Sequence, residues 1–390
     1  MSARSIRVLV VDDSAVIRQI ICDHVSAAPG MAVAGTASDG QQALDLLDTL
    51  EVDVVTLDIQ MPKLDGLATL DAILARRPLP VVMVSALTRL GADITLDALD
   101  RGALDYVAKP EGVAQAACVL GEELLRKIRS AAGIDVRRIL EIRRERKHRR
   151  AEQAGEGDSP IVGPTLRAAA GKSGQSPQKQ FAQEAAAELA DKCIALGLST
   201  GGPPALASLF EGLRPPLPPI VVVQHMPPQF TRPLARRLDA LSRLSIREAQ
   251  DGDLLRPDHV LIAPGGRHLA LRGSGRGGRV ALGDGPPVSG HRPSVDVMMK
   301  SAAAVFGSRC LGVIMTGMGR DGADGCQAIR HAGGYVLGQD EASSDVYGMN
   351  KVAHVEGNVD RQFSLDQAAQ VITLHVKRLW QCQSLGAAPG

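Results

Sequence analysis

Short apolar runs alternate with amphipathic stretches along most of the 390-residue chain, and this alternation restricts the fold more than any other feature of the sequence. In the first part of the chain the pattern predicts five strands and five helices. The strands are expected at 6–11, 31–35, 52–57, 81–84 and 104–107, and the helices at about 15–25, 41–50, 67–75, 94–99 and 113–128. Continuous apolar strands separated by helices are typical of a parallel sheet that is covered on both faces.

Polar side chains follow or close these predicted strands. Asp12 and Asp13 end the first strand, Asp58 the third, Ser85 the fourth and Lys109 the fifth. Because the carboxyl ends of parallel strands share one edge of the sheet, we expect the five side chains to converge there. Clustered carboxylates favour Mg²⁺, and a carboxylate beside Mg²⁺ and a lysine is a suitable phosphoryl acceptor. The alternative is that these aspartates only cap helices, which does not explain all five positions together.

Five short motifs carry a resemblance to a known family. They are VVDDS at 10–14, LDIQMP at 57–62, DG at 65–66, VSA at 84–86 and AKP at 108–110. On these motifs the first domain, 1–128, resembles a response-regulator receiver domain, which has a flavodoxin-like fold with a five-stranded parallel sheet. The resemblance implies that Asp58 is phosphorylated by a histidine kinase.

The same resemblance implies the remaining receiver residues. Asp12, Asp13 and Asp58 would hold Mg²⁺, with the backbone carbonyl of Gln60 as a further ligand. Ser85 and Lys109 would contact the phosphoryl group, and Tyr106 would reorient when Ser85 moves.

A basic stretch follows the first domain. Residues 129–189 are expected to form a basic helical extension, rich in arginine at 143–150, and then a flexible linker rich in Gly, Ser, Gln and Ala. Binding to DNA is the alternative for the basic block, but aromatic residues and a helix-turn-helix pattern are missing from it.

The alternation resumes after Lys192 and predicts a second doubly wound, mostly parallel α/β domain over 190–385. Its first strand, beginning near Cys193, ends in a glycine-flanked turn of the form G-x-S-x-G that contains Ser199. Such a turn exposes a serine hydroxyl at the edge of a sheet and leaves backbone N–H groups free to bind an oxyanion.

Two later strand ends carry a histidine and an aspartate. His225 follows the apolar run 220–223, and Asp321 lies in the glycine-rich loop after 311–315. A serine hydroxyl needs an imidazole to take its proton and a carboxylate to orient that imidazole. The order Ser, His, Asp differs from the Ser, Asp, His order of α/β-hydrolases. On residues alone the assignment stays open, and the competitors are His259, His268 and His291 for the base and Asp296, Asp324 and Asp340 for the acid.

A second resemblance rests on longer motifs. They are GLSTGG at 197–202, QHMP at 224–227, RPSVD at 292–296, MTGMGRDG at 315–322, QDEAS at 339–343 and YGM at 347–349. The second domain thereby resembles the catalytic domain of chemotaxis protein-glutamate methylesterases, the CheB family. The resemblance implies Ser199 as nucleophile, His225 as base, Asp321 as orienting acid and Met318 as a backbone N–H donor to the oxyanion, with no cofactor at the esterase site.

These resemblances imply a phosphorylation-activated serine esterase. It would demethylate glutamyl γ-methyl esters on methyl-accepting chemoreceptors, deamidate particular receptor glutamines and serve adaptation in a chemosensory two-component pathway. The domain order predicts that the unphosphorylated receiver domain restricts access to Ser199. An interaction protein that has lost catalysis is the alternative, and the complete set of three residues argues against it.

Composition excludes several other classes. A formal net charge of +1 gives no global case for binding nucleic acid or an anionic membrane, and no apolar run reaches the length of a membrane span. Six scattered cysteines without a C-x-x-C pair favour reduced thiols, and we find no signal peptide. We therefore expect a cytoplasmic protein without membrane insertion. We also expect it to be a monomer.

Overall fold

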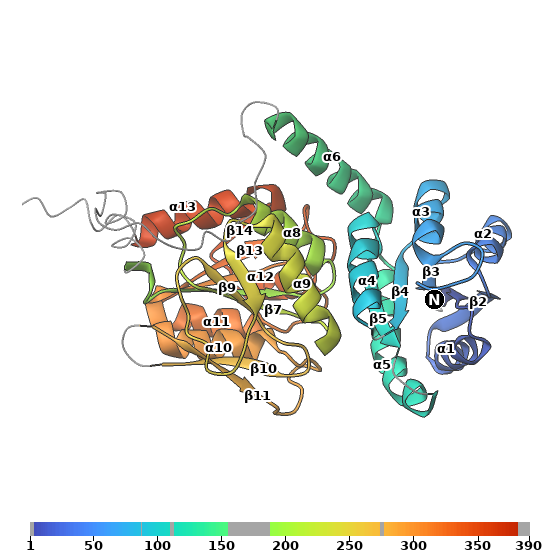
Figure 1. The fold of residues 1–390 in the computed structure, drawn as a ribbon, viewed down its shortest axis with the longest axis horizontal. Coiled ribbons are helices and arrows are strands. Elements are labelled where there is room, and N and C mark those ends of the chain that lie inside the picture. Colours follow the sequence, from blue (N-terminus) through green and yellow to red (C-terminus); the bar gives the residue numbers. More distant parts are fainter. Residues whose placement is uncertain (1–3, 87, 110–112, 155–187, 274–276, 381–390) are drawn as a thin grey trace, which may run out of the picture. The chain divides into compact units, whose positions relative to one another are not determined.

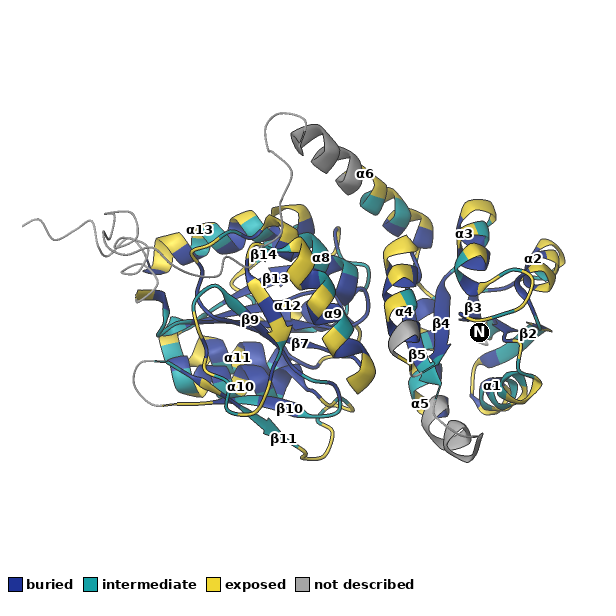
Figure 2. Cartoon of the chain, viewed as in Figure 1, coloured by how far each residue is buried: buried dark blue, intermediate teal, exposed yellow. Residues whose placement is uncertain are grey.

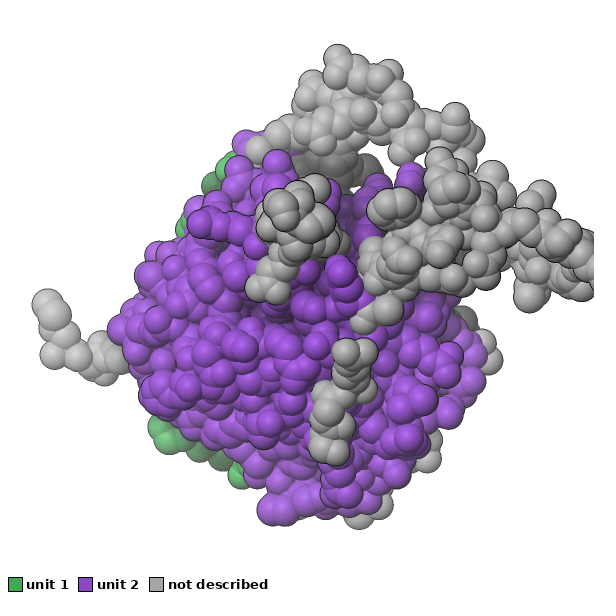
Figure 3. All heavy atoms as spheres, turned by 90° about the vertical axis from the view of Figure 1, so that its left-hand side faces the viewer, with its two compact units in different colours: residues 1–144 green, residues 145–390 purple. Residues whose placement is uncertain are grey.

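The computed structural model describes residues 4–86, 88–109, 113–154, 188–273 and 277–380. The chain divides into two compact units, Met1–Arg144 and Glu145–Gly390, which Figure 3 colours separately. None of the helices in the described ranges is both long and apolar enough to span a membrane.

The first unit is a five-stranded parallel sheet in the order β2-β1-β3-β4-β5, with helices between successive strands (Figure 1). The strands are β1 (Ile6–Val11), β2 (Met31–Ala37), β3 (Val54–Asp58), β4 (Val81–Ala86) and β5 (Asp105–Lys109). The helices are α1 (Ala15–Ala27), α2 (Gly40–Thr49), α3 (Gly66–Arg76), α4 (Arg89–Arg101) and α5 (Val113–Ala131). The predicted parallel sheet and all ten predicted elements are confirmed, with ends that differ by a few residues.

Side-chain caps fix where four of these helices begin. Ser14, Asp39, Asp65 and Thr88 each accept a hydrogen bond from the backbone N–H three residues further on. Such caps satisfy N–H groups that the first helical turn leaves unpaired. One face of the sheet and the helices α1 and α5 then enclose an aliphatic core that includes Val10, Ile21 and Ile128.

The basic extension is helical, but it is not continuous with α5. Helix α5 ends at Ala131 and α6 (Val136–Ala154) begins after a short turn, where Asp135 accepts from the backbone N–H of Arg138 at 3.2 Å. The N-terminal turns of α6 bury Val136 and Ile139, the latter in the core of the first unit. The predicted flexible linker falls on residues 155–187, which lie outside the described residues.

The second unit contains a seven-stranded parallel sheet in the order β14-β13-β12-β6-β7-β9-β8 and a separate antiparallel hairpin, β10-β11. The strands are β6 (Cys193–Leu198), β7 (Ile220–Gln224), β8 (Ser245–Glu248), β9 (His259–Ile262), β10 (His268–Arg272), β11 (Arg279–Gly283), β12 (Cys310–Ile314), β13 (Tyr335–Gln339) and β14 (Arg361–Phe363). The chain extends the sheet from β6 in one direction and then returns to the other side of β6 with β12. The reversal of strand order between β6 and β12 marks where ligands bind in open α/β sheets.

Helices cover both faces of this sheet. They are α8 (Gly202–Gly212), α9 (Pro228–Leu241), α10 (Val295–Phe306), α11 (Ala323–His331), α12 (Met349–Val355) and α13 (Ala368–Trp380), with short 3₁₀ turns at Gly307–Arg309 and Leu365–Gln367. Helix α10 packs on α11, on β6 and on the hairpin, whereas α8 packs on α9 and α13. The inner strands β6, β7 and β12 are buried along their whole length. Figure 2 colours the chain by burial, with buried residues in dark blue.

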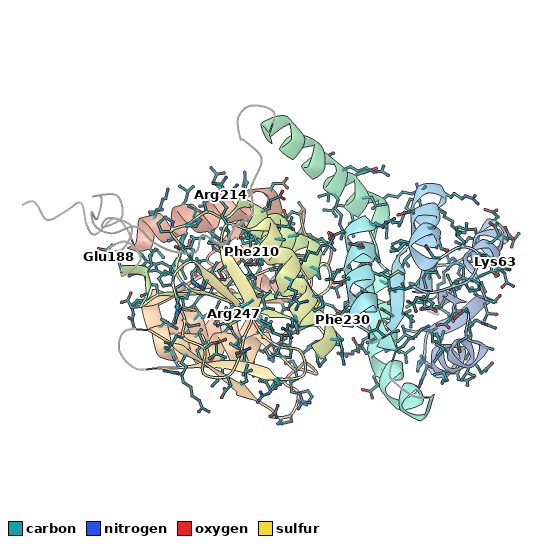
Figure 4. All side chains as sticks on the ribbon, in the orientation of Figure 1. Lys63, Glu188, Phe210, Arg214, Phe230 and Arg247 are labelled. Atoms are coloured by element: carbon teal, nitrogen blue, oxygen red, sulfur yellow. The ribbon has the colours of Figure 1, made fainter. Side chains whose placement is uncertain are left out.

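Helix α9 starts at Pro228 and contains Pro233 in its interior. Phe230, Leu234 and Leu238 recur at helical spacing and are all buried, so one apolar face continues past the proline. Phe230 of α9 and Phe210 of α8 are among the largest fully buried side chains of the unit (Figure 4).

Candidate active site

Three neighbouring strands of the second unit bring the predicted catalytic residues to one edge. Leu198 of β6 is in register with Gln224 of β7, so the residues that follow them, Ser199 and His225, leave the sheet side by side. The backbone N–H of His225 donates to the carbonyl of Leu198 at 3.2 Å. On the other side of β6, the N–H of Ser199 donates to the carbonyl of Thr316, just beyond β12, at 3.0 Å.

The turn at Ser199 is held by hydrogen bonds to its own backbone. The Ser199 carbonyl accepts from the N–H of Gly202 at 2.8 Å and from the side-chain amide of Gln224 at 2.9 Å. Gly201 takes a φ of 76°, which a residue with a side chain adopts only at a cost in strain. Ser199 is 9% exposed, so little of the residue is open to solvent.

Asp321 fixes one ring nitrogen of His225. Nε2 of His225 lies 2.8 Å from Oδ2 of Asp321, and the two side chains are 8% and 1% exposed. A carboxylate only accepts hydrogen bonds, so Nε2 carries the proton and Nδ1 keeps its lone pair. Nδ1 is buried and has no hydrogen-bond partner among the described residues. His225 therefore offers Nδ1 as the atom that can take a proton.

The start of α10 surrounds the Asp321 carboxylate with donors. Ser294 Oγ donates to Oδ1 at 2.7 Å, and the backbone N–H groups of Val295 and Asp296 donate to Oδ2 and Oδ1 at 2.7 and 3.0 Å. Burial alone would raise the pKa of Asp321, but the hydrogen bond from His225 and these donors hold that pKa well below its ordinary value. Asp321 thus stays ionised at the amino end of a helix.

A second buried carboxylate lies beside Asp321. Oδ1 of Asp296 accepts from the backbone N–H groups of Gly322 and Gly325, at 2.9 and 2.7 Å, and so shapes the loop that carries Asp321. Burial, followed by the negative charge of Asp321, raises the pKa of Asp296 to about 6. Of the two carboxyl groups, Asp296 is the one that more readily holds a proton.

The competing residues lie elsewhere or play other parts. Nδ1 of His259 faces the carbonyl of Pro257, and Nε2 of His268 faces the carbonyl of Pro286. Asp324 pairs with Arg320 and Lys300, and Asp340 accepts from Ser343. His291 is different, because its ring stacks on that of His225, with centroids 3.7 Å apart and planes 7° apart.

The loop after β12 passes directly over the serine. A Cβ added to Gly317 would lie 2.8 Å from Cβ of Ser199, so only glycine permits this approach. The N–H of Gly317 donates to the carbonyl of Val346, and its carbonyl accepts from Met349, which fixes the loop. Met318, the predicted oxyanion donor, is the next residue and is 36% exposed.

The predicted phosphorylation site gathers at the carboxyl edge of the first sheet. Single carboxylate oxygens of Asp12, Asp13 and Asp58 all lie within 4.8 Å of one another, which fits a divalent cation held by hard oxygen ligands. Nζ of Lys109 lies 2.8 Å from both Asp12 and Asp58. Burial, opposed by Lys109 and reinforced by Asp12, raises the pKa of Asp58 to about 6. Gln60, the predicted carbonyl ligand, is exposed beside this cluster.

Ser85 and Tyr106 occupy defined positions near this cluster. The Ser85 hydroxyl is fully buried and lies 2.8 Å from the hydroxyl of Thr95 on α4, a partner that sequence reasoning missed. Tyr106 is 3% exposed, and Nζ of Lys127 lies 4.9 Å from the centroid of its ring. Both side chains thus point into the unit.

Comparison with known proteins supplies the family. The profile of the CheB methylesterase family matches residues 194–372, and that of response-regulator receiver domains matches residues 8–117. A protein-glutamate methylesterase/protein-glutamine glutaminase from Pectobacterium atrosepticum is 41% identical over 366 residues, 94% of this chain and 95% of that protein. A protein of the same name from Symbiobacterium thermophilum is 43% identical over 95% of this chain and 97% of its own length. This chain belongs to the protein-glutamate methylesterase/protein-glutamine glutaminase family.

Among solved structures, the CheB methylesterase catalytic domain of Thermotoga maritima is 38% identical, with a TM-score of 0.47. The match covers 47% of this chain and 98% of that one. The response-regulator domain of Thermotoga maritima CheB is 45% identical, with a TM-score of 0.31, and the match covers 34% and 99% of the two chains.

The structure also shows a buried polar support beneath the methylesterase site that the sequence analysis missed. Oε1 of Gln339 accepts from the backbone N–H of Thr316 at 2.9 Å, and its Nε2 donates to the carbonyl of Ser343 at 2.8 Å. The hydroxyl of Thr316 donates to the carbonyl of Thr200, next to the serine. Gln339 is the first residue of the QDEAS motif. A polar motif at the end of a strand is the sequence signal that could have indicated this support.

Proposed function

We propose that this protein is a phosphorylation-activated serine esterase. Its substrates are glutamyl γ-methyl esters of methyl-accepting chemoreceptors, and particular receptor glutamines that it deamidates. The observation that carries the proposal is the orientation of His225: Asp321 holds Nε2, and Nδ1 remains available beside the strand end that carries Ser199. Membership of the methylesterase family supports the substrate class.

In the proposed reaction the Ser199 hydroxyl attacks the ester carbonyl while Nδ1 of His225 takes the hydroxyl proton. The new oxyanion is bound by backbone N–H groups, Met318 among them. Collapse of this intermediate breaks the bond to the methoxy group, which leaves as methanol with the proton from His225. Water then adds to the acyl-enzyme with His225 again as base, and glutamate is released. A glutamine side chain follows the same course with ammonia as leaving group.

Asp321 contributes electrostatically. When His225 becomes an imidazolium, the ionised carboxylate at 2.8 Å stabilises the new positive charge and keeps the ring in one orientation. The donors from Ser294 and the start of α10 hold this carboxylate in place without neutralising it. No cofactor is required by this scheme.

The receiver unit supplies the control in this proposal. Asp58 accepts a phosphoryl group from a chemotaxis-type histidine kinase, and Asp12, Asp13, Asp58 and the carbonyl of Gln60 would hold Mg²⁺. When bound, Mg²⁺ would offset the negative charge of the transferring phosphoryl group. Lys109 and Ser85 contact the phosphoryl group, Tyr106 follows Ser85, and the phosphorylated receiver releases the esterase from restraint. The proposal places a monomeric enzyme in the cytoplasm, where the kinase and the methylated receptor segments meet.

Mass spectrometry of candidate receptors tests the activity. Receptors incubated with the protein should lose methyl groups from glutamates, and those incubated with Ser199→Ala should not, with at least a thousandfold loss of rate. A serine-reactive phosphonate should label Ser199 in the unchanged protein. Receptors that lose methyl groups equally fast with Ser199→Ala would exclude Ser199 as the nucleophile.

A comparison of methanol release with and without a small phosphate donor tests the control. The donor should accelerate release by the unchanged protein but not by Asp58→Asn, whereas Asp45→Asn on the exposed side of α2 should respond normally. Residues 190–390 alone should be faster than the unphosphorylated whole chain. If they are no faster, the receiver does not restrain the esterase.

A further inference from the structure

His291 and His225 form a close, parallel pair of rings. Their centroids lie 3.7 Å apart and their planes differ by 7°, which is face-to-face contact. The proposed reaction uses Ser199, His225 and Asp321, and it gives no role to a second imidazole stacked on the base. His291 does not compete with Asp321 for Nε2, because that nitrogen already donates to Oδ2.

The segment that carries His291 is tied down on both sides of the histidine. Its N–H and carbonyl exchange hydrogen bonds of 2.9 and 3.0 Å with Val288, and the carbonyl of Arg292 accepts from Gly266 at 3.1 Å. Two residues after Arg292, Ser294 donates to Asp321, and Val295 and Asp296 follow with their backbone N–H groups. One continuous segment, 291–296, therefore contacts both members of the His225–Asp321 pair.

The stacked ring of His291 limits how the His225 ring can turn. The hydrogen bond to Asp321 holds Nε2 but only weakly limits rotation of the ring about the Cβ–Cγ bond, because Nε2 lies close to the axis of that bond. A flat ring in parallel contact with the face of His225 prevents this rotation, because rotation would drive one ring into the other. The direction of Nδ1 is then fixed. Transfer of the Ser199 hydroxyl proton to Nδ1 requires such a fixed direction.

We propose that His291 is a positioning residue that holds the plane of His225 so that Nδ1 faces Ser199. This inference rests on the proposed function, since it assigns the base to His225. His291 acts through its flat ring and exchanges no proton, so another flat ring in the same place retains the function. The face of an aromatic ring also attracts the imidazolium that forms on His225 during the reaction.

Steady-state methanol release by the full-length protein tests the proposal, with the variants His291→Ala, His291→Leu and His291→Phe. From the strength of stacked ring pairs, we expect loss of the flat ring in His291→Ala and His291→Leu to lower kcat about three- to tenfold. KM should change less than twofold, because His291 does not bind substrate. Phe should restore most of kcat. His331→Ala, on the exposed last turn of α11, is the matched control and should leave kcat unchanged.

Labelling of Ser199 by a phosphonate provides a second measure, because it reports activation of the serine without receptor binding. The labelling rate should fall in His291→Ala and His291→Leu by the same factor as kcat, and it should recover in His291→Phe. The proposal is overturned if kcat of His291→Ala stays within twofold of the unchanged protein, or if His291→Phe is as slow as His291→Leu. It is also overturned if the variants raise KM and leave kcat unchanged. If Ala does not fold, Leu and Phe still decide the question, because both fill the space and only one is flat. Failure of Ser199→Ala to abolish activity would instead refute the proposed function itself.

Discussion

At the scale of single residues, the most decisive feature is that Asp321 accepts four hydrogen bonds, from His225, Ser294 and the start of α10. Asp321→Asn would keep the size of the side chain but place an NH₂ group where only acceptors fit. His225 would then turn to the wrong tautomer, and kcat for methanol release should fall about 10³- to 10⁴-fold. Asp324→Asn, in an exposed ion pair three residues away, should stay within twofold. Equal kcat values in the two variants would contradict the role of Asp321.

The approach of the β12 loop to Ser199 gives a steric prediction. In Gly317→Ala the new Cβ would lie 2.5 Å from Sδ of Met349 and 2.8 and 3.0 Å from Cβ and N of Ser199, so Met349 and either this loop or the serine turn must shift. We expect kcat to fall at least tenfold, with about 1–3 kcal/mol less stability from overpacking. Gly283→Ala meets nothing within 4 Å and should change neither quantity. Full activity in Gly317→Ala would show that the turn can yield without cost.

At the scale of elements, Asp296 joins α10 to the start of α11 through Gly322 and Gly325. Its pKa is raised to about 6, chiefly by burial and then by Asp321. The folded protein therefore binds a proton more tightly than the unfolded chain, and stability from this group is lost as pH rises through about 4 to 6. Asp296→Asn keeps an acceptor oxygen and cannot ionise, so it avoids this loss.

Urea unfolding at pH 4.5 and pH 7.5 measures the effect. The stability of Asp296→Asn relative to the unchanged protein should be greater at pH 7.5 than at pH 4.5, on the order of 1–2 kcal/mol. A difference that is constant with pH, or that is larger at low pH, would show that Asp296 is ionised without cost in the folded protein.

The sequence predicts elements well where burial dictates the pattern. Continuous apolar runs predict β6, β7 and β12. Because the carboxyl ends of parallel strands share one edge of a sheet, the sequence also predicts that Ser199 and His225 lie at the same edge, and β6 and β7 are parallel neighbours. The short strands β8 and β14 at the two sheet edges and the short helix α12 were missed, because each has too few buried residues for a clear period. Interactions that depend on loop paths, such as His291 on His225 or Gln339 under Thr316, leave no periodic signal.

At the scale of the whole molecule, the two units have separate aliphatic cores. Ile21 lies in the core between the first sheet, α1 and α5, whereas Met298 of α10 lies in the core of the second unit, and both are fully buried. The sole tryptophan of the chain, Trp380, is at the end of α13 in the second unit. Its fluorescence therefore reports unfolding of the esterase unit and not of the receiver unit.

Two matched core variants should separate the two transitions in urea. Met298→Ala leaves a cavity beside α10 and should destabilise the esterase unit by about 2–5 kcal/mol, which lowers the midpoint that Trp380 reports. Ile21→Ala should leave this midpoint unchanged and instead add an early loss of helical circular dichroism from the receiver unit. If Ile21→Ala lowers the Trp380 midpoint as far as Met298→Ala does, the two cores unfold as one cooperative unit. Restraint of the esterase by the receiver would then involve the stability of the whole chain, and not only access to Ser199.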